Sequence, residues 1–184
     1  MGFMNEIFNK KMADSIREFH LPRYHELPNT GLYLEQTVQY INQCIQPLGC
    51  TPITSSMVSN YVKQGAFAGP VKRLYYAEQL AHLMVIAVMK NILSMENIYR
   101  LFRMQKGVYT DQVAYDYFCS ELENMLLFIF GVRDTVEDIG VTVSDEKMLL
   151  RSAIISVSHM IHLNCCFIVM QMEKVGAGED NYEL

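Results

Sequence analysis

The sequence predicts a mostly helical protein, with an N-terminal winged helix-turn-helix domain and a helical C-terminal domain. Three observations support this prediction. A helical apolar stripe runs from Leu34 to Leu48, a short polar helix and a basic turn follow between Thr54 and Tyr76, and long apolar helical patterns come after them. Because 51% of the 184 residues are hydrophobic, the chain can bury a core and is not expected to be disordered.

Charge is divided unevenly along the chain. Residues 1–107 hold eleven Lys or Arg and seven Asp or Glu, whereas residues 108–184 hold four and thirteen. The balances of +4 and −9 suggest a front part that can meet an anion and a back part with another task. We expect an N-terminal helix at 1–19, the winged helix-turn-helix domain at 20–107, and a helical dimerisation or sensing domain with a polar tail at 108–184.

The first helical pattern runs from Met4 to Phe19, and the proline-punctuated stretch 21–31 connects it to the next helix. Apolar residues at steps of four and three predict a helix that starts at Leu34 and ends near Gly49. A turn follows. Thr54 or Ser55 is placed to cap the helix after it.

The stretch from Thr54 to Tyr76 holds three cations and no carboxylate. Its first half predicts a short helix with two unlike sides. The inward side holds Met57, Val58, Tyr61 and Val62, and the other side holds Ser56, Ser59, Asn60 and Lys63. After Gly65, residues 66–75 predict a tight turn between two short extended pieces, the β-wing. A polar, cationic helix face beside a basic turn suits a DNA groove and its flanking phosphates.

Helices fill the rest of the chain. Residues 77–91 are apolar almost all round, which predicts a buried hub helix, and Ser94 caps a helix that ends near Gly107. A long helix is expected from Thr110 to Gly131, and a last helix from Ser144 to about Lys174. We expect the aromatic-rich segment 109–131 and the last helix to carry dimerisation or effector sensing.

The last helix contains two features that need weighing. Residues 152–170 are apolar and long enough to span a membrane, but His159, His162 and Asn164 favour a buried or subunit-interface helix. His159, His162 and Cys166 share one helix face and are competent for zinc or haem. Half-buried histidines beside small apolar cysteines are the simpler interpretation. We therefore expect no metal and no other cofactor.

Other classes of protein find little support. Five cysteines without a C-x-x-C pair favour reduced thiols, and the N-terminus lacks the apolar run of a signal peptide, so we expect a cytoplasmic protein without a membrane partner. There is no Gly-rich phosphate loop, no H-E-x-x-H and no G-x-S-x-G. We therefore expect no enzyme activity and no catalytic residues.

The order of residues around the turn resembles the DNA-binding domain of MerR-type regulators. The similarity lies in Asn60-Tyr61, Lys63-Gln64-Gly65, Pro70, Lys72-Arg73-x-Tyr75 and Ser94-Met95-Glu96-Asn97-Ile98. Residues 20–105 more closely resemble a bacterial family with the MerR-like fold, named domain of unknown function 1836. The resemblance implies that the second helix faces DNA through Ser56, Ser59, Asn60, Tyr61 and Lys63. It also implies that Lys72, Arg73 and Tyr75 reach the DNA backbone from the wing.

The sequence thus leads to one expected function and two alternatives. We expect a transcriptional regulator that binds double-stranded DNA as a homodimer and leaves room for a small-molecule effector. The alternatives are a protein-interaction module on the same fold without DNA binding, and a metal- or haem-responsive sensor. Cations that lie far apart, or that pair with carboxylates, would argue against DNA binding.

Overall fold

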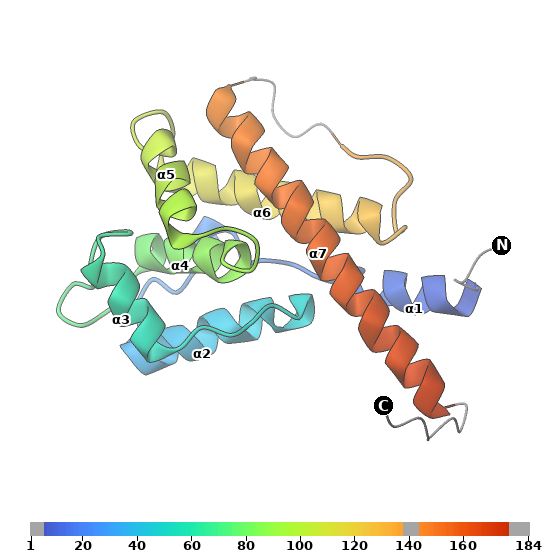
Figure 1. Cartoon of the computed structure of the whole chain (residues 1–184). Coiled ribbons are helices and arrows are strands. Elements are labelled where there is room, and N and C mark those ends of the chain that lie inside the picture. The colour runs from blue at the N-terminus through green and yellow to red at the C-terminus, as the bar shows by residue number, and fades with distance from the viewer. Residues whose placement is uncertain (1–5, 138–143, 177–184) are drawn as a thin grey trace.

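The computed structural model describes residues 6–137 and 144–176 and is mostly helical, as the sequence predicts. Figure 1 shows the long last helix lying across the others. The described part forms α1 Glu6–Ile16, α2 Leu34–Ile45, α3 Ser55–Lys63, α4 Ala77–Met89, α5 Met95–Gln105, α6 Asp111–Ile129 and α7 Asp145–Gly176, with short 3-10 turns at η1 Tyr24–Glu26 and η2 Gln46–Leu48. The polar tail expected after residue 176 lies outside the described residues.

The helix α4 is the centre of the fold. Nine of its thirteen residues are buried, and α2, α6, α7, α5 and η1 all pack against it. Leu80, Leu83, Met84 and Ile86 are each 0% exposed. An all-round apolar helix must be covered on every side, so the prediction of a buried hub is confirmed.

The expected β-wing is not formed. Between α3 and α4, the described chain contains only two isolated bridges, Val71 with Leu74 and Leu32 with Tyr75. Pro70 lacks the N–H group that would extend the first arm, and the second arm ends at Tyr76, where the backbone enters α4. The connection is therefore a tight turn rather than a pair of strands.

The core is continuous across Gly107, where the sequence suggests a domain boundary. One cluster of buried side chains includes residues from all seven helices. The segment before η1 also reaches over to α6: the Arg23 guanidinium donates to both Glu123 carboxylate oxygens at 2.7 and 2.6 Å, and the Leu21 N–H donates to Glu123 at 2.9 Å. The hydrogen bonds to Glu123 raise the pKa of Arg23. The two expected domains share one interior.

The helix α7 packs along α6 and also contacts α1, α4 and α5. Its Arg151 forms an ion pair with the buried Glu121 of α6, with 2.8 Å between Nε and Oε1. Among the described residues, one helical stretch, Asp145–Met172, is long enough and apolar enough to cross a membrane. However, 39% of its most apolar window is buried inside the protein. Length and composition alone are weak evidence for a span, because buried core helices pass the same test.

The clamp between Arg23 and Glu123 should contribute measurably to stability. We expect Glu123→Gln to lower the free energy of unfolding by about 2 kcal/mol, because a half-buried guanidinium loses its charged, bidentate partner. Urea unfolding of the full chain measures the change. The matched control is Glu96→Gln, which breaks the exposed Glu96–Arg100 pair and should cost no more than about 0.5 kcal/mol. Equal effects for the two variants would contradict the clamp.

Candidate nucleic-acid interface

The turn between α2 and α3 is fixed by one side chain. Asn42 of α2 accepts a hydrogen bond from the Ile53 N–H at 2.8 Å and donates to the Ile53 carbonyl at 2.9 Å. Ile53 itself is 1% exposed. Thr54 then caps α3, because its hydroxyl accepts from the Met57 N–H at 3.3 Å. The orientation of α3 relative to α2 is therefore set by buried contacts and a paired amide.

The helix α3 has one buried and one open side. Val58 and Tyr61 are buried against the core. The open side carries the polar residues that the spacing places there, all of them exposed: Ser56, Ser59, Asn60 and Lys63. The four side chains thus form a small neutral-to-cationic surface on a nine-residue helix.

The chain after α3 folds back against it. Gly65 ends the helix with a φ of +71°, and a Cβ added at Gly69 would lie 3.3 Å from the Val62 side chain. Phe67 stacks on His82 of α4, with 5.8 Å between ring centroids. In Figure 1, α3 and this connection lie together at one end of the molecule, far from α1.

The basic turn has an unusual backbone. Val71 and Leu74 exchange both backbone hydrogen bonds, at 3.0 and 2.9 Å, around two residues with positive φ: Lys72 at 50° and Arg73 at 69°. Turns with two positive φ values strongly favour Gly, which has no β-carbon to clash, and Asn, whose short polar side chain can hydrogen-bond locally. No other non-glycine residue of the described chain has a positive φ. Lys72 and Arg73 are both exposed and each costs about 1 kcal/mol of strain.

The base of the turn is held firmly. Leu32 and Tyr75 exchange backbone hydrogen bonds of 2.8 Å in both directions. Gly31 makes room for this pairing, since a Cβ there would lie 3.0 Å from both the Leu74 side chain and the Tyr76 ring. The turn therefore projects from a backbone anchored on both sides, and its two cations point into solvent from a fixed base.

Two expected contact residues need correction. Tyr61 is 6% exposed and Tyr75 is 5% exposed, and both belong to the core. Desolvation raises the pKa of each phenol. Tyr61 lies one helical step from Val58 on the inward side, and the side chain of Tyr75 packs inward from the base of the turn. Their rings are packed in the core beneath α3 and the basic turn and are not exposed on the surface.

The three cations of α3 and the basic turn are Lys63, Lys72 and Arg73. None of them makes an ion pair within the described part of the chain. One acid lies nearby that sequence reasoning missed. Glu35, at the start of α2, accepts a hydrogen bond from the Ser55 hydroxyl at 2.7 Å. Sequence spacing cannot bring positions 35 and 55 together, because their proximity depends on the angle between α2 and α3. The first turn of α3 is therefore less positive than its last turn.

A second polar contact at the end of α3 was also not foreseen. The Tyr99 hydroxyl of α5 donates to the Gln64 amide oxygen at 2.9 Å. The contact ties α5 to the last turn of α3, next to Lys63. A tyrosine within a helix gives no sequence signal for a tertiary hydrogen bond of this kind.

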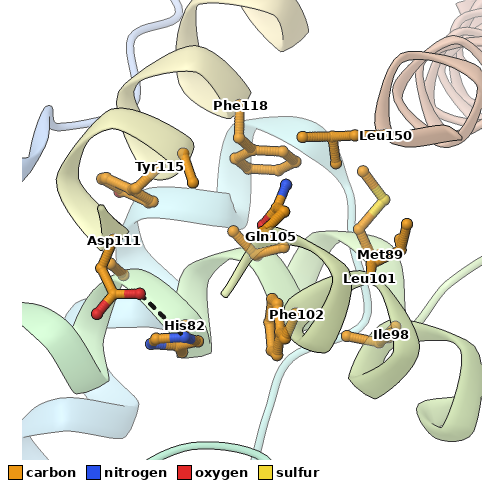
Figure 2. A pocket seen from close by; sticks show the side chains of 13 residues that line it. His82, Met89, Ile98, Leu101, Phe102, Gln105, Asp111, Tyr115, Phe118 and Leu150 are labelled. Carbon is orange, nitrogen blue, oxygen red and sulfur yellow. Dashed lines mark ion pairs between the residues drawn. The ribbon is translucent and has the colours of Figure 1, made fainter. Parts of the chain in front are cut away.

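A small cavity lies among α4, α5, α6 and α7, as Figure 2 shows. His82 lies at its edge: its Nδ1 donates to the Glu78 carbonyl at 2.8 Å, and its Nε2 is 3.8 Å from Asp111. Phe102 meets the His82 ring edge-on at 4.8 Å. The space measures about 30 Å³, which is room for about one water molecule. His82 is a partly buried residue that joins α4 to α5 and α6.

The histidines and cysteines of α7 do not gather into a metal site. Among the described residues, no group of three His, Cys, Asp or Glu side chains could hold a metal ion. Cys166 lies 3.8 Å from His162, whose ring meets Phe130 edge-on at 4.9 Å, and burial lowers the pKa of His162. His159 is exposed to solvent. The His162–Cys166 pair is a packed contact between α7 and the end of α6.

Relief of the strained turn should stabilise the protein. We expect Lys72→Asn with Arg73→Gly to raise the free energy of unfolding by about 1 to 2 kcal/mol, because Asn and Gly accept positive φ at little cost. Lys72→Ala with Arg73→Ala is the control, since it removes the same charges but keeps both β-carbons. Chemical denaturation compares the three proteins. Equal stability of the Asn-Gly and Ala-Ala variants would show that the turn stores no strain.

Comparison with known proteins identifies one matching family. Residues 22–118 match the model of a family described as a domain of unknown function, DUF1836. The matched region begins at the connector before η1, includes α2, α3, the basic turn, α4 and α5, and ends within α6. No curated protein and no solved structure gives a significant match. Because the family model covers more than half of the chain, this protein belongs to the DUF1836 family.

Proposed function

We propose that this protein is a transcriptional regulator that binds double-stranded DNA as a homodimer. The observation that carries the proposal is the turn at Lys72 and Arg73, where two cations occupy a backbone conformation suited to Asn and Gly. Backbone strain that a simple substitution would relieve tends to persist where the side chains have a task. Two exposed, unpaired cations on the connection that follows α3 are suited to bind phosphate.

The helix α3 fits a DNA groove by size and chemistry. Nine residues make a helix about 14 Å long, and its exposed side carries short polar groups without a large apolar side chain. The Asn60 amide can both donate to and accept from an adenine edge in the major groove. Ser56 and Ser59 can donate to phosphate oxygens, and Lys63 adds a cation at the end of the helix.

The order of elements also supports the proposal. The helix α2, a fixed turn, the helix α3 and a basic turn follow in the order that is typical of a helix-turn-helix with a wing. The sequence Lys72-Arg73-x-Tyr75 resembles the end of the wing in MerR-type regulators. We propose a MerR-like arrangement in which the wing is reduced to the turn at 71–74. The protein would then work in the cytoplasm, where its DNA is.

Three cations per copy give weak attraction to DNA, so useful affinity calls for two copies. Each neutralised phosphate contributes about −0.9 to the slope of log K against log salt. If Lys63, Lys72 and Arg73 each contact one phosphate, a dimer should have a slope of about −5. A pair of half-sites about one helical turn apart would then be read by two copies of α3.

The salt slope tests the phosphate contacts. Lys72→Ala with Arg73→Ala removes four contacts from a dimer, so the slope should fall from about −5 to about −2. The control is Lys10→Ala with Arg17→Ala. It removes two exposed cations, one in α1 and one directly after it, and α1 lies far from α3 in Figure 1. Fluorescence anisotropy with a random-sequence duplex measures the salt slope of the wild type and of both variants. A slope that is the same in all three proteins would rule out the turn as a phosphate site.

The amide of Asn60 should read a base rather than a phosphate. With a duplex selected from a random library, Asn60→Ala should weaken binding by about 10- to 100-fold and leave binding to unselected duplex unchanged. Asn97→Ala, an exposed asparagine in the first turn of α5, is the matched control. An equal loss on both kinds of duplex would mean that Asn60 only holds the backbone.

The open apolar side of α7 favours a second candidate, a protein-interaction module without DNA binding. The two functions differ in one result. A wild-type protein that retains no duplex at low salt would remove the regulator proposal and leave the interaction module.

A further inference from the structure

One side of α7 is uncovered and apolar. The helix packs its inner side on α6 and α1 and leaves the other side in solvent. No charged residue occurs between Arg151 and Glu173, although a helix face in water normally carries charges. The exposed large apolar residues of α7 are Met148, Leu149, Ile155, Leu163, Phe167, Ile168, Met170 and Met172.

We propose that this open side of α7 binds the same side of α7 in a second copy of the chain. The two helices run antiparallel, and the two-fold axis passes near His159. This pair is the dimer of the proposed function, and only its role in DNA binding rests on that function. Size and orientation of the pair can be measured without DNA, so failure of the dimer and failure of DNA binding are seen separately.

The exposed side chains are arranged symmetrically about His159. Met148 and Met170 lie eleven residues before and after it, and Ile155 and Leu163 lie four residues before and after it. All five fall on one side of the helix, because they are separated by steps of three and four or their sums. In a two-fold interface each contact occurs twice, with the partners exchanged. An antiparallel pair would set Met148 against Met170 and Ile155 against Leu163.

The same copy also provides a hollow and a projection that fit together. A groove of about 450 Å³ lies between α5 and the first half of α7, lined by Leu93, Leu101, Met104, Leu149, Ser152 and Ser156 among others. Phe167 is 56% exposed in the second half of α7, whose end extends past the other helices in Figure 1. A two-fold axis at residue 159 places position 167 of one copy opposite position 151 of the other copy, beside Leu149 and Ser152 of that copy. Each Phe167 would therefore enter the groove of the other copy.

Polar groups on this side can be covered at little cost. The Ser152 hydroxyl donates to the Met148 carbonyl and the Ser156 hydroxyl donates to the Ser152 carbonyl, both at 2.9 Å. Their hydrogen bonds stay within the helix when a partner covers them. At the axis, the two His159 imidazoles would meet, and neutral imidazoles can share a hydrogen bond because one donates and the other accepts.

The surface is large enough for a specific pair. From residue 148 to residue 170 the stripe is about 34 Å long. With the α5 flank it is roughly 15 to 20 Å wide, since packed helices lie about 8 to 10 Å apart. A footprint of roughly 500 to 700 Å² per copy approaches the about 800 Å² of standard interfaces. Exposed apolar patches larger than a few hundred Å² commonly mark interaction sites.

A lipid bilayer is a less suitable cover. The inner side of α7 is committed to the protein, where Arg151 pairs with Glu121 at 2.8 Å, so the helix cannot span a membrane without exposing α6. His159 lies in the middle of the open side and would be costly in hydrocarbon. The symmetric spacing about residue 159 has no purpose on a lipid surface.

The mass of the protein in solution tests the pair. Light scattering on the eluting full chain should give twice 21.2 kDa for the wild type. Leu163→Glu with Phe167→Glu should give 21.2 kDa, with the dimer Kd raised at least about 100-fold, because each copy would bury two unpaired charges. Val71→Glu is the control, since Val71 is equally exposed on the basic turn and should leave the dimer intact. Circular dichroism establishes that each variant is folded.

Cross-linking tests the orientation. Cys44 and Cys165, the two cysteines that are not fully buried, are first replaced by serine. His159→Cys should then form a disulfide between copies, and Met148→Cys should cross-link to Met170→Cys only when the two proteins are mixed. Disulfides within pure Met148→Cys or pure Met170→Cys would indicate parallel helices and overturn the proposal.

Other outcomes of the mass measurement also decide the question. A wild-type monomer overturns the proposal, and so does a dimer that survives the two glutamates. Sedimentation with vesicles of phosphatidylcholine and phosphatidylglycerol is measured alongside. A monomer that sediments with these vesicles would identify lipid as the cover of α7.

Discussion

The need to bury α4 on all sides organises this protein. Its residues are apolar almost all round, and Leu80, Leu83, Met84 and Ile86 have no exposed surface. A helix of this kind cannot fold beside a single partner, so it requires α2 and α6 as neighbours together with contacts from α5 and α7. The front and back parts of the chain are joined for the same reason, because each covers a different side of one helix. The Arg23–Glu123 clamp reinforces that joining at the edge of the core.

The polar surface at α3 depends on this core for its rigidity. Asn42 fixes the turn before α3, Tyr61 holds the helix from beneath, and the Leu32–Tyr75 pairing anchors the basic turn. On that rigid base, the chain keeps Lys72 and Arg73 in a conformation that costs stability. Proteins commonly give up some stability at functional sites, and the stability cost of this turn can be measured. Elsewhere on the surface, α7 leaves exposed the apolar face that we propose binds a second copy.

Much of the fold is predictable from local patterns, and the limits are physical. The stripe from Leu34 and the caps at Thr54, Ser94 and Thr110 define helices α2, α3, α5 and α6 through nearest-neighbour geometry. The prediction of a β-wing was wrong. The short stretch around Lys72 and Arg73 has the pattern of two strands, but Pro70 on one side and the start of α4 on the other leave no room for them. The positive φ of both cations carries no sequence signal, since neither is Gly or Asn. Tyr61 and Tyr75 were assigned to DNA through a resemblance, whereas their burial is a property of the packing.

Central to the proposed function is that α3 and the basic turn form the surface that meets DNA. The most direct test is to follow the backbone amide signals of the isotope-labelled chain by NMR while a random-sequence duplex is added at low salt. We expect the shifted signals to map to residues 55–64 and 71–74 and the shifts to reverse when salt is raised. Shifts confined to α7, or no shifts at any salt concentration, would contradict it.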